Sequence, residues 1–285
     1  MADYRRWQRE EGAQACAAGL ISGAERPEIN ILGISLKSFG IVFACGFIAS
    51  GAILIRRLRE LGKPSDWSYE MAFAALVGGL VGSRLYFIIQ NYDQVKHDLL
   101  GSLFSGSGLV WYGGVIGGAI AVAGWAWWRG MLNLGLLDLA SAPLAMGYAI
   151  GRIGCQVSGD GDYGKPSTLP TAMSYPHGTV PTPPGVTVLP TPIYETLAMG
   201  LVAWWLWRMR DRVRPGALFA AYLLFSGLER LLIEFIRRND RVFVGMTVPQ
   251  FESIAAIIAG VVWLLLLARR GGVRTRGPDR AVAVA

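Results

Sequence analysis

Charged residues and histidine are both scarce in this 285-residue sequence. Only two histidines are present, His97 and His177, and 16% of the residues are charged, whereas 53% are hydrophobic. The mean hydropathy is +0.39. Such a composition is far more apolar than that of an average soluble domain, so it excludes an ordinary soluble protein and indicates one that lies in lipid.

Cysteine is also rare, with only Cys16, Cys45 and Cys155. Their wide separation predicts neither a disulfide framework nor a zinc site, and we expect no metal.

The first thirty residues lack an apolar run long enough for a cleaved signal peptide, so the first span should be its own insertion signal. The net charge of +7 comes mostly from residues that follow apolar segments. Membrane topology explains this pattern better than nucleic-acid binding.

Seven apolar segments approach the ~20 residues that a helix needs to cross a bilayer. They predict an all-α integral membrane protein of about seven transmembrane helices with a small extracytoplasmic loop domain. The predicted spans are 35–55, 68–90, 109–128, 135–157, 192–209, 216–236 and 246–268. The domains are an N-terminal segment (1–34), the first four helices (35–157), the loop domain (158–191), the last three helices (192–268) and a basic tail (269–285).

Arginine and lysine cluster in alternate loops, at 56–63 and 208–214, and again in the tail. The positive-inside rule therefore predicts an extracytoplasmic N-terminus and a cytoplasmic C-terminus. The basic loop at 237–241 falls on the opposite side, which calls for a local reason such as an anionic ligand.

The loop at 158–191 is rich in Gly, Pro, Ser and Thr. Its length favours a functional lid or mouth, with a disordered linker as the alternative.

Ionisable residues within the predicted spans are candidate functional residues, because an unpaired charge in lipid is costly. Arg84 and Arg152 lie toward the outer ends of the second and fourth spans, and Arg230, Glu234 and Arg237 follow one face of the sixth. An Arg230–Glu234 ion pair that only joins helices is the alternative for that pair. We expect Arg84, Arg152 and Arg237 to exceed the nearby carboxylates and to bind a phosphate, whose oxygens match the guanidinium fork.

Glycines recur at small-xxx-small spacing in two of the predicted spans. Gly113, Gly114, Gly117 and Gly118 lie in the third, and Gly147, Gly151 and Gly154 in the fourth. Close helix packing explains most of them. Backbone approach to a ligand is the alternative for Gly113 and Gly114, and for the segment 159–161.

Five motifs in order resemble the prolipoprotein diacylglyceryl transferase family, over about residues 33–262. The central one is Gly151-Arg152-Ile153-Gly154, which continues through Ser158-Gly159-Asp160 to Tyr163-Gly164-Lys165. The other motifs are Gly79 to Tyr86, Trp111-Tyr112-Gly113-Gly114, Pro190 to Glu195, and Arg230 to Arg237.

The resemblance implies an enzyme without a cofactor in the bacterial inner membrane. It would transfer the diacylglyceryl group of phosphatidylglycerol, a membrane lipid, to the lipobox cysteine of a preprolipoprotein and release glycerol phosphate. Arg84, Arg152 and Arg237 would then bind the headgroup, with Arg152 and Arg237 also acting in catalysis. The further substrate-binding residues implied are Gly113, Gly114, Gly154, Cys155, Gly164, Tyr194, Glu195, Arg230 and Glu234.

The chain departs from the family at several motif positions. Tyr112 and Leu189 replace histidines, Cys155 replaces an asparagine and Phe39 a tyrosine. A histidine base is therefore excluded. Asp160 is the better candidate to accept the thiol proton, because a tyrosine pKa near ~10 favours a hydrogen-bonding role for Tyr112.

Three alternatives remain open at this point. Cys155 either packs as a small residue or forms a covalent intermediate. A divergent relative would use another acceptor. A phospholipid-binding protein or transporter would keep the arginines without the reaction.

Overall fold

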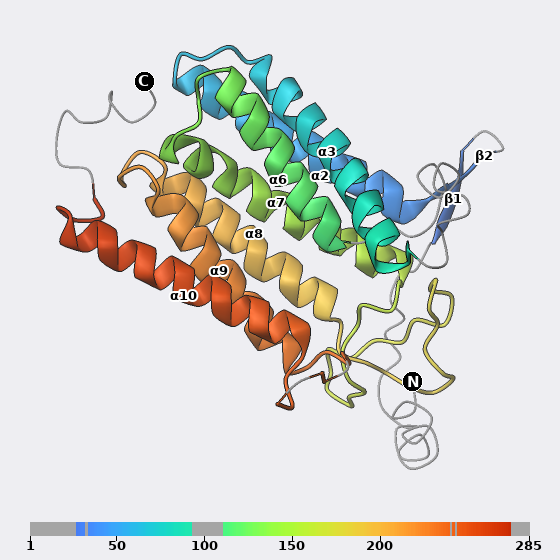
Figure 1. The fold of residues 1–285 in the computed structure, drawn as a ribbon. Helices are drawn as coiled ribbons and strands as arrows, with labels where there is room; N and C mark the ends of the chain where they lie inside the picture. Colours follow the sequence, from blue (N-terminus) through green and yellow to red (C-terminus); the bar gives the residue numbers. More distant parts are fainter. Residues whose placement is uncertain (1–26, 32–33, 93–110, 240, 243, 275–285) are drawn as a thin grey trace. The chain divides into compact units, whose positions relative to one another are not determined.

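The computed structural model describes residues 27–31, 34–92, 111–239, 241–242 and 244–274. Within these residues the chain forms seven helices and a pair of strands (Figure 1). The helices are α2 (Ser38–Glu60), α3 (Trp67–Gln90), α6 (Trp111–Trp128), α7 (Leu134–Ser158), α8 (Thr191–Met209), α9 (Ala217–Glu234) and α10 (Val248–Arg269). Each coincides with one predicted span. The largest difference is at the end of α2, which we predicted at residue 55 and which lies at Glu60.

Two paired strands that were not predicted from the sequence precede α2. Strands β1 (Glu28–Ile31) and β2 (Ile34–Lys37) are antiparallel, with Glu28 opposite Lys37. Ile and Leu recur at every second position of these strands, a pattern typical of a strand. Because residues 34–37 are extended, the helix begins at Ser38 and not at the predicted residue 35, and Ser38 hydrogen-bonds to the carbonyl of Pro27.

Four of the described helices, α2, α3, α7 and α10, are long and apolar enough to cross a membrane. Helix α6 is apolar but shorter, with the stretch Gly113–Trp128. Large apolar side chains on the helices are exposed, among them Ile48, Phe73 and Ile120. Exposed apolar surface of this kind suits lipid rather than water. The chain is therefore a helical membrane protein.

The described residues form two compact units, and α2 and α7 contribute to both. One unit contains Gly51–Leu139 and is called here the α3–α6 unit; the α7–α10 unit contains the residues up to Ser50 and from Ala140 on. In the α3–α6 unit the two helices pack glycine against glycine. A Cβ added at Gly82 would lie 2.3 Å from the carbonyl oxygen of Gly113, and one at Gly117 would lie 2.3 Å from that of Gly78. Close helix packing is thus confirmed for Gly113 and Gly117.

In the α7–α10 unit, neighbouring helices lie side by side (Figure 1). Helix α9 packs on α10, where a Cβ at Gly260 would lie 2.6 Å from the carbonyl oxygen of Ala220. Helix α8 packs on α9 through an edge contact between Trp205 and Phe225. Helices α7 and α8 are joined by Thr196, whose hydroxyl donates to the carbonyl of Ala149 at 3.1 Å. These contacts fix the ends of α7, α8 and α9 relative to one another.

The segment from 159 to 190 connects α7 to α8 and has a small core of its own. The rings of Tyr163 and Tyr175 stack with centroids 4.8 Å apart, and Val186 and Val188 are buried with them. Paired backbone hydrogen bonds join Met173 to Val188. A turn-rich sequence thus forms a hydrogen-bonded structure here, which holds the first residues after α7 in place.

Candidate functional site

Helix α7 ends in a turn that brings two aspartates back toward its last residues. Gly159 and Gly161 have φ values of +57° and +95°. Glycine adopts this left-handed region without the steric penalty that other residues incur, and it is a common helix terminator. Asp160 accepts a hydrogen bond from the backbone N–H of Asp162 at 3.1 Å. The two glycines therefore place both carboxylates beside the end of α7.

Two arginines from different elements converge on Asp162. Arg152 of α7 binds its Oδ2 through Nη1. Arg237, which follows the end of α9, binds its Oδ1 through Nη2 at 2.6 Å. Nη1 of Arg237 also donates to the backbone carbonyl of Asp162 at 3.3 Å, and the Thr191 hydroxyl donates to the same oxygen at 2.6 Å. One carboxylate therefore bridges two guanidinium groups while its backbone is held independently.

Glu195 is a second anion shared by the arginines, and it is fully buried. Its Oε1 accepts from the Tyr148 hydroxyl at 2.9 Å and from Arg230 Nη1 at 3.1 Å. Its Oε2 lies 3.4 Å from Arg152 Nε and 3.6 Å from Arg237 Nη1, and is held by these charges without a hydrogen bond. Glu195 at the start of α8 thus faces positive side chains from α7, α9 and the segment after α9.

These carboxylates overturn one expectation about the charges. We predicted that the arginines would exceed the nearby acidic groups, but in the α7–α10 unit Arg152 and Arg237 share Asp162 and Glu195. The prediction was wrong because Asp162 was not recognised as a partner. The alternation Gly159-Asp160-Gly161-Asp162 was the available signal, since it directs two acidic side chains back toward α7.

The predicted polar face of the sixth span also needs correction. Helix α9 ends at Glu234, so Arg237 lies beyond it and not on its face. Arg230 is nearer to Glu195, at 3.1 Å, than to Glu234, at 3.7 Å. Oε1 of Glu234 accepts from Asn239 at 2.8 Å and from the Thr247 hydroxyl at 2.7 Å. Glu234 therefore joins the end of α9 to the start of α10, while Arg230 belongs to the Glu195 cluster.

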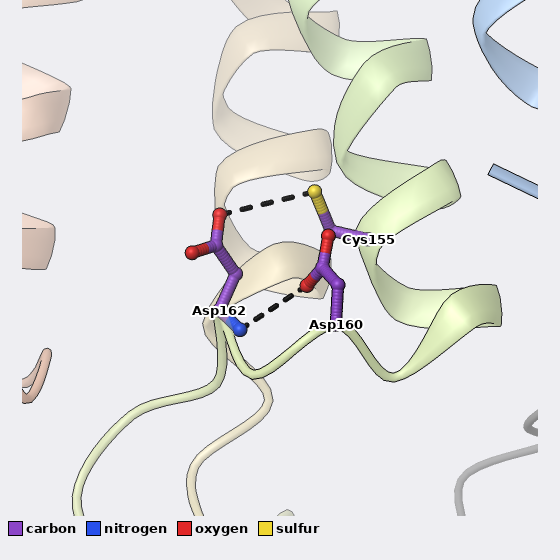
Figure 2. Close-up of side chains that lie close together, drawn as sticks. All are labelled: Cys155, Asp160 and Asp162. Carbon is purple, nitrogen blue, oxygen red and sulfur yellow. Dashed lines mark hydrogen bonds between the residues drawn. The ribbon is translucent and has the colours of Figure 1, made fainter. Parts of the chain in front are cut away.

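Asp160, Asp162 and Cys155 face one another at the end of α7 (Figure 2). One carboxylate oxygen of each aspartate and the Cys155 sulfur all lie within 4.8 Å of one another. Burial raises the pKa of the Asp160 carboxyl, although the Cys155 thiol opposes this effect. Burial alone would also raise the pKa of Asp162, but the positive charges of Arg237 and Arg152 outweigh it and hold that pKa below its usual value. Two carboxyls two residues apart thus differ in their affinity for a proton.

Within the described residues, the donor atoms of Cys155, Asp160 and Asp162 lie close enough together to reach a single metal ion. Two guanidinium groups already neutralise Asp162. Their positive charge opposes a cation at the same place. We assign no ion to the cluster.

Several predicted residues have structural contacts. A Cβ at Gly154 would lie 3.3 Å from the Phe39 ring, and one at Gly164 would lie 2.7 Å from the carbonyl oxygen of Ile236. Both glycines therefore allow close packing. The Tyr194 hydroxyl shares a hydrogen bond of 2.7 Å with Thr171, so it links α8 to the segment at 159–190.

Four predicted residues belong to the α3–α6 unit. Arg84 is buried there, and Gly113 and Gly114 lie in α6. Tyr112 also lies in α6, but its side chain is outside the described part of the chain. A role for these residues beside Arg152 and Arg237 stays a prediction.

The sequence pattern of the prolipoprotein diacylglyceryl transferase family matches residues 27–266. The chain belongs to this family. It is similar to the phosphatidylglycerol–prolipoprotein diacylglyceryl transferase of Clostridium tetani, with 32% identity covering 81% of this chain and 93% of the relative. The protein of that name from Leptospira interrogans is 31% identical, with 76% of each chain covered. The transferase 2 of Clostridium perfringens is 29% identical, with 81% and 91% covered.

Membership of the prolipoprotein diacylglyceryl transferase family makes the chain an enzyme of transferase type. The arginine–carboxylate cluster lies where three of the motifs meet, since Arg152, Glu195 and Arg237 come from three separate sequence blocks. Residues distant in the sequence thus form one charged site in the α7–α10 unit.

Proposed function

We propose that the protein transfers the diacylglyceryl group of phosphatidylglycerol to the lipobox cysteine of a preprolipoprotein and releases glycerol phosphate. One observation carries this proposal beyond family membership: Arg152 and Arg237, from different elements, both bind one bridging anion. A carboxylate presents two oxygens to two guanidinium groups, and so does the phosphodiester of a phospholipid. The pair is therefore an anion site of suitable chemistry for the donor headgroup.

The reaction is a substitution at the glyceryl carbon attached to the phosphodiester oxygen. The cysteine sulfur forms a bond to that carbon, the carbon–oxygen bond breaks, and its electron pair leaves with glycerol phosphate. The leaving group gains negative charge as the bond breaks. Arg152 and Arg237 would stabilise that charge, and cations held in place beforehand lower the barrier most effectively.

Asp160 is the proposed acceptor of the thiol proton. Its pKa is raised by burial, so its carboxylate binds a proton more tightly than an ordinary aspartate does. A general base is most effective when its pKa lies nearer the working pH. Asp162 suits this role less well, because the arginines stabilise its charged form. The difference between these two carboxyls supports Asp160 over Asp162.

We also propose the topology of a seven-span inner-membrane enzyme, with the N-terminus outside and the C-terminus in the cytoplasm. Seven helices and the basic residues after α2, α8 and α10 support it. The segment at 159–190 would then be an extracytoplasmic loop domain, and the site would face the outer half of the bilayer. The family resemblance implies that the transfer takes place on that side.

Complementation tests the proposed function in cells. A bacterium depleted of its own diacylglyceryl transferase should grow when it expresses this chain, and its lipoproteins should carry the lipid. Arg152→Ala, expressed at the same level in the membrane, is the matched negative variant. Absence of lipidation with the unchanged chain, despite correct insertion, would reject the proposal.

A further inference from the structure

Asp162 occupies the position between Arg152 and Arg237 that the proposed donor phosphate needs. Its Oδ2 binds Arg152 and its Oδ1 binds Arg237, so both carboxylate oxygens are engaged. The two arginine side chains are 15% and 7% exposed, whereas that of Asp162 is 35% exposed. Of these three side chains, that of Asp162 is thus the most exposed, and an arriving anion reaches it first.

We infer that Asp162 is an internal competitor, which holds the arginine pair in the substrate-free enzyme and yields it to the phosphate of the donor. This inference rests on the proposed function. The Asp162 carboxylate occupies Arg152 Nη1 and Arg237 Nη2, the two nitrogens that a bridging phosphodiester would need. Binding of the donor therefore requires the carboxylate to leave.

The backbone contacts indicate how Asp162 leaves. Its carbonyl oxygen accepts from Thr191 and Arg237 independently of the carboxylate, and its N–H donates to Asp160. The main chain is therefore anchored, and rotation of the side chain alone frees Arg152 Nη1 and Arg237 Nη2, the two nitrogens that bind its carboxylate. The same carboxylate would return after the reaction and help to displace glycerol phosphate, because it competes with that product for the same donors.

Removal of the competing charge should tighten binding of the product. If the carboxylate holds the arginines about nine-tenths of the time, the apparent dissociation constant is raised about tenfold, and Asp162→Asn should lower it by about that factor. The amide keeps the size of the side chain and loses the charge. The same variant should lower KM for phosphatidylglycerol and slow release of glycerol phosphate, so that kcat falls while KM falls.

The experiment measures inhibition by glycerol phosphate in vesicles of phosphatidylglycerol, for the unchanged enzyme, Asp162→Asn and Asp211→Asn. Asp211 lies two residues after Met209, the last residue of α8, which is about 21 Å along the helix from Glu195 at ~1.5 Å per residue, and its variant loses the same charge. Tighter inhibition in Asp162→Asn only is the expected result. An unchanged or weaker inhibition constant would overturn the inference and make Asp162 a structural partner of the arginines.

A binding measurement keeps the inference testable if Asp162→Asn has no turnover. Protection against thermal unfolding by glycerol phosphate should then begin at a lower concentration for this variant than for the unchanged protein. Equal or higher concentrations would refute the competition. An unchanged enzyme that releases no glycerol phosphate from phosphatidylglycerol would instead refute the proposed function, and the binding comparison would still decide the role of Asp162.

Discussion

Replacement of Arg237 offers a quantitative test of the anion site. Arg237 reaches Asp162 Oδ1 at 2.6 Å with one nitrogen, and the Asp162 carbonyl at 3.3 Å and Glu195 at 3.6 Å with another. Lysine keeps the positive charge but has a single nitrogen, so Arg237→Lys loses at least one charge-assisted hydrogen bond. Such a bond contributes about 1.5–3 kcal/mol. If that stabilisation is lost from the transition state, kcat/KM should fall about 10- to 150-fold.

Arg237→Ala should be more damaging, because it also leaves two carboxylates without a cation that they share. Removal of one partner of a buried ion pair costs about 3–5 kcal/mol. That cost falls on the free energy of unfolding, whereas kcat/KM should fall by more than about 150-fold, because the charge and both charge-assisted hydrogen bonds of Arg237 are lost. The assay is release of glycerol phosphate from phosphatidylglycerol vesicles with a lipobox peptide as acceptor, with thermal unfolding measured to confirm that each variant is folded.

Arg208→Ala is the matched control for Arg237. Arg208 lies in the last turn of α8, at the opposite end from Glu195, with its guanidinium 5.8 Å from the Trp204 ring. A surface substitution of this kind usually changes the free energy by less than ~0.5 kcal/mol, so activity should stay within about twofold. Near-normal activity in folded Arg237→Ala would refute the reasoning, as would a lysine variant equal to the unchanged enzyme.

Three further predictions concern other parts of the structure. Asp160→Asn should lower the rate most at neutral pH and lose the rise in kcat/KM that occurs as pH increases through the raised pKa of Asp160; an unaltered pH profile would exclude it as the base. Gly82→Ala should destabilise the protein by about 1–3 kcal/mol, since the new Cβ would meet the Gly113 carbonyl, whereas Gly124→Ala, with open space around it, should not; equal unfolding temperatures would contradict the packing. Thr168→Cys, at an exposed position, should react with a membrane-impermeant maleimide added to intact cells, and labelling only after permeabilisation would reverse the topology.

The helices were predictable because an apolar segment that crosses a bilayer must satisfy its own backbone hydrogen bonds, and a helix does so within one segment. Among the charges inside such segments, Arg152, Glu195 and Arg230 do lie together, whereas Arg84 belongs to the other unit. Their partners were not predictable in the same way. Glu195 contacts residues 43 positions earlier and 42 later in the chain, at Arg152 and Arg237, and no local pattern encodes such pairs.

The contact of Asp162 with the two arginines could not be predicted, because it depends on the backbone conformation of the turn after α7. Asp160 and Asp162 are both acidic and two residues apart, so composition cannot separate them. The left-handed turns at Gly159 and Gly161 direct Asp162 toward the arginines and bring both carboxylates close to the Cys155 thiol. The β-hairpin at 28–37 was overlooked because its short apolar strands adjoin an apolar helix, and the whole stretch reads as the beginning of a span.

The most direct test of the central claim is the stoichiometry of the reaction. The purified protein would be placed in vesicles of phosphatidylglycerol labelled in the headgroup, with a peptide that carries a lipobox cysteine. One glycerol phosphate should be released for each thioether formed, and a peptide with serine in place of that cysteine should give neither product. Release at the same rate without a thiol acceptor, or no release from a folded protein with the complete peptide, would contradict a diacylglyceryl transferase.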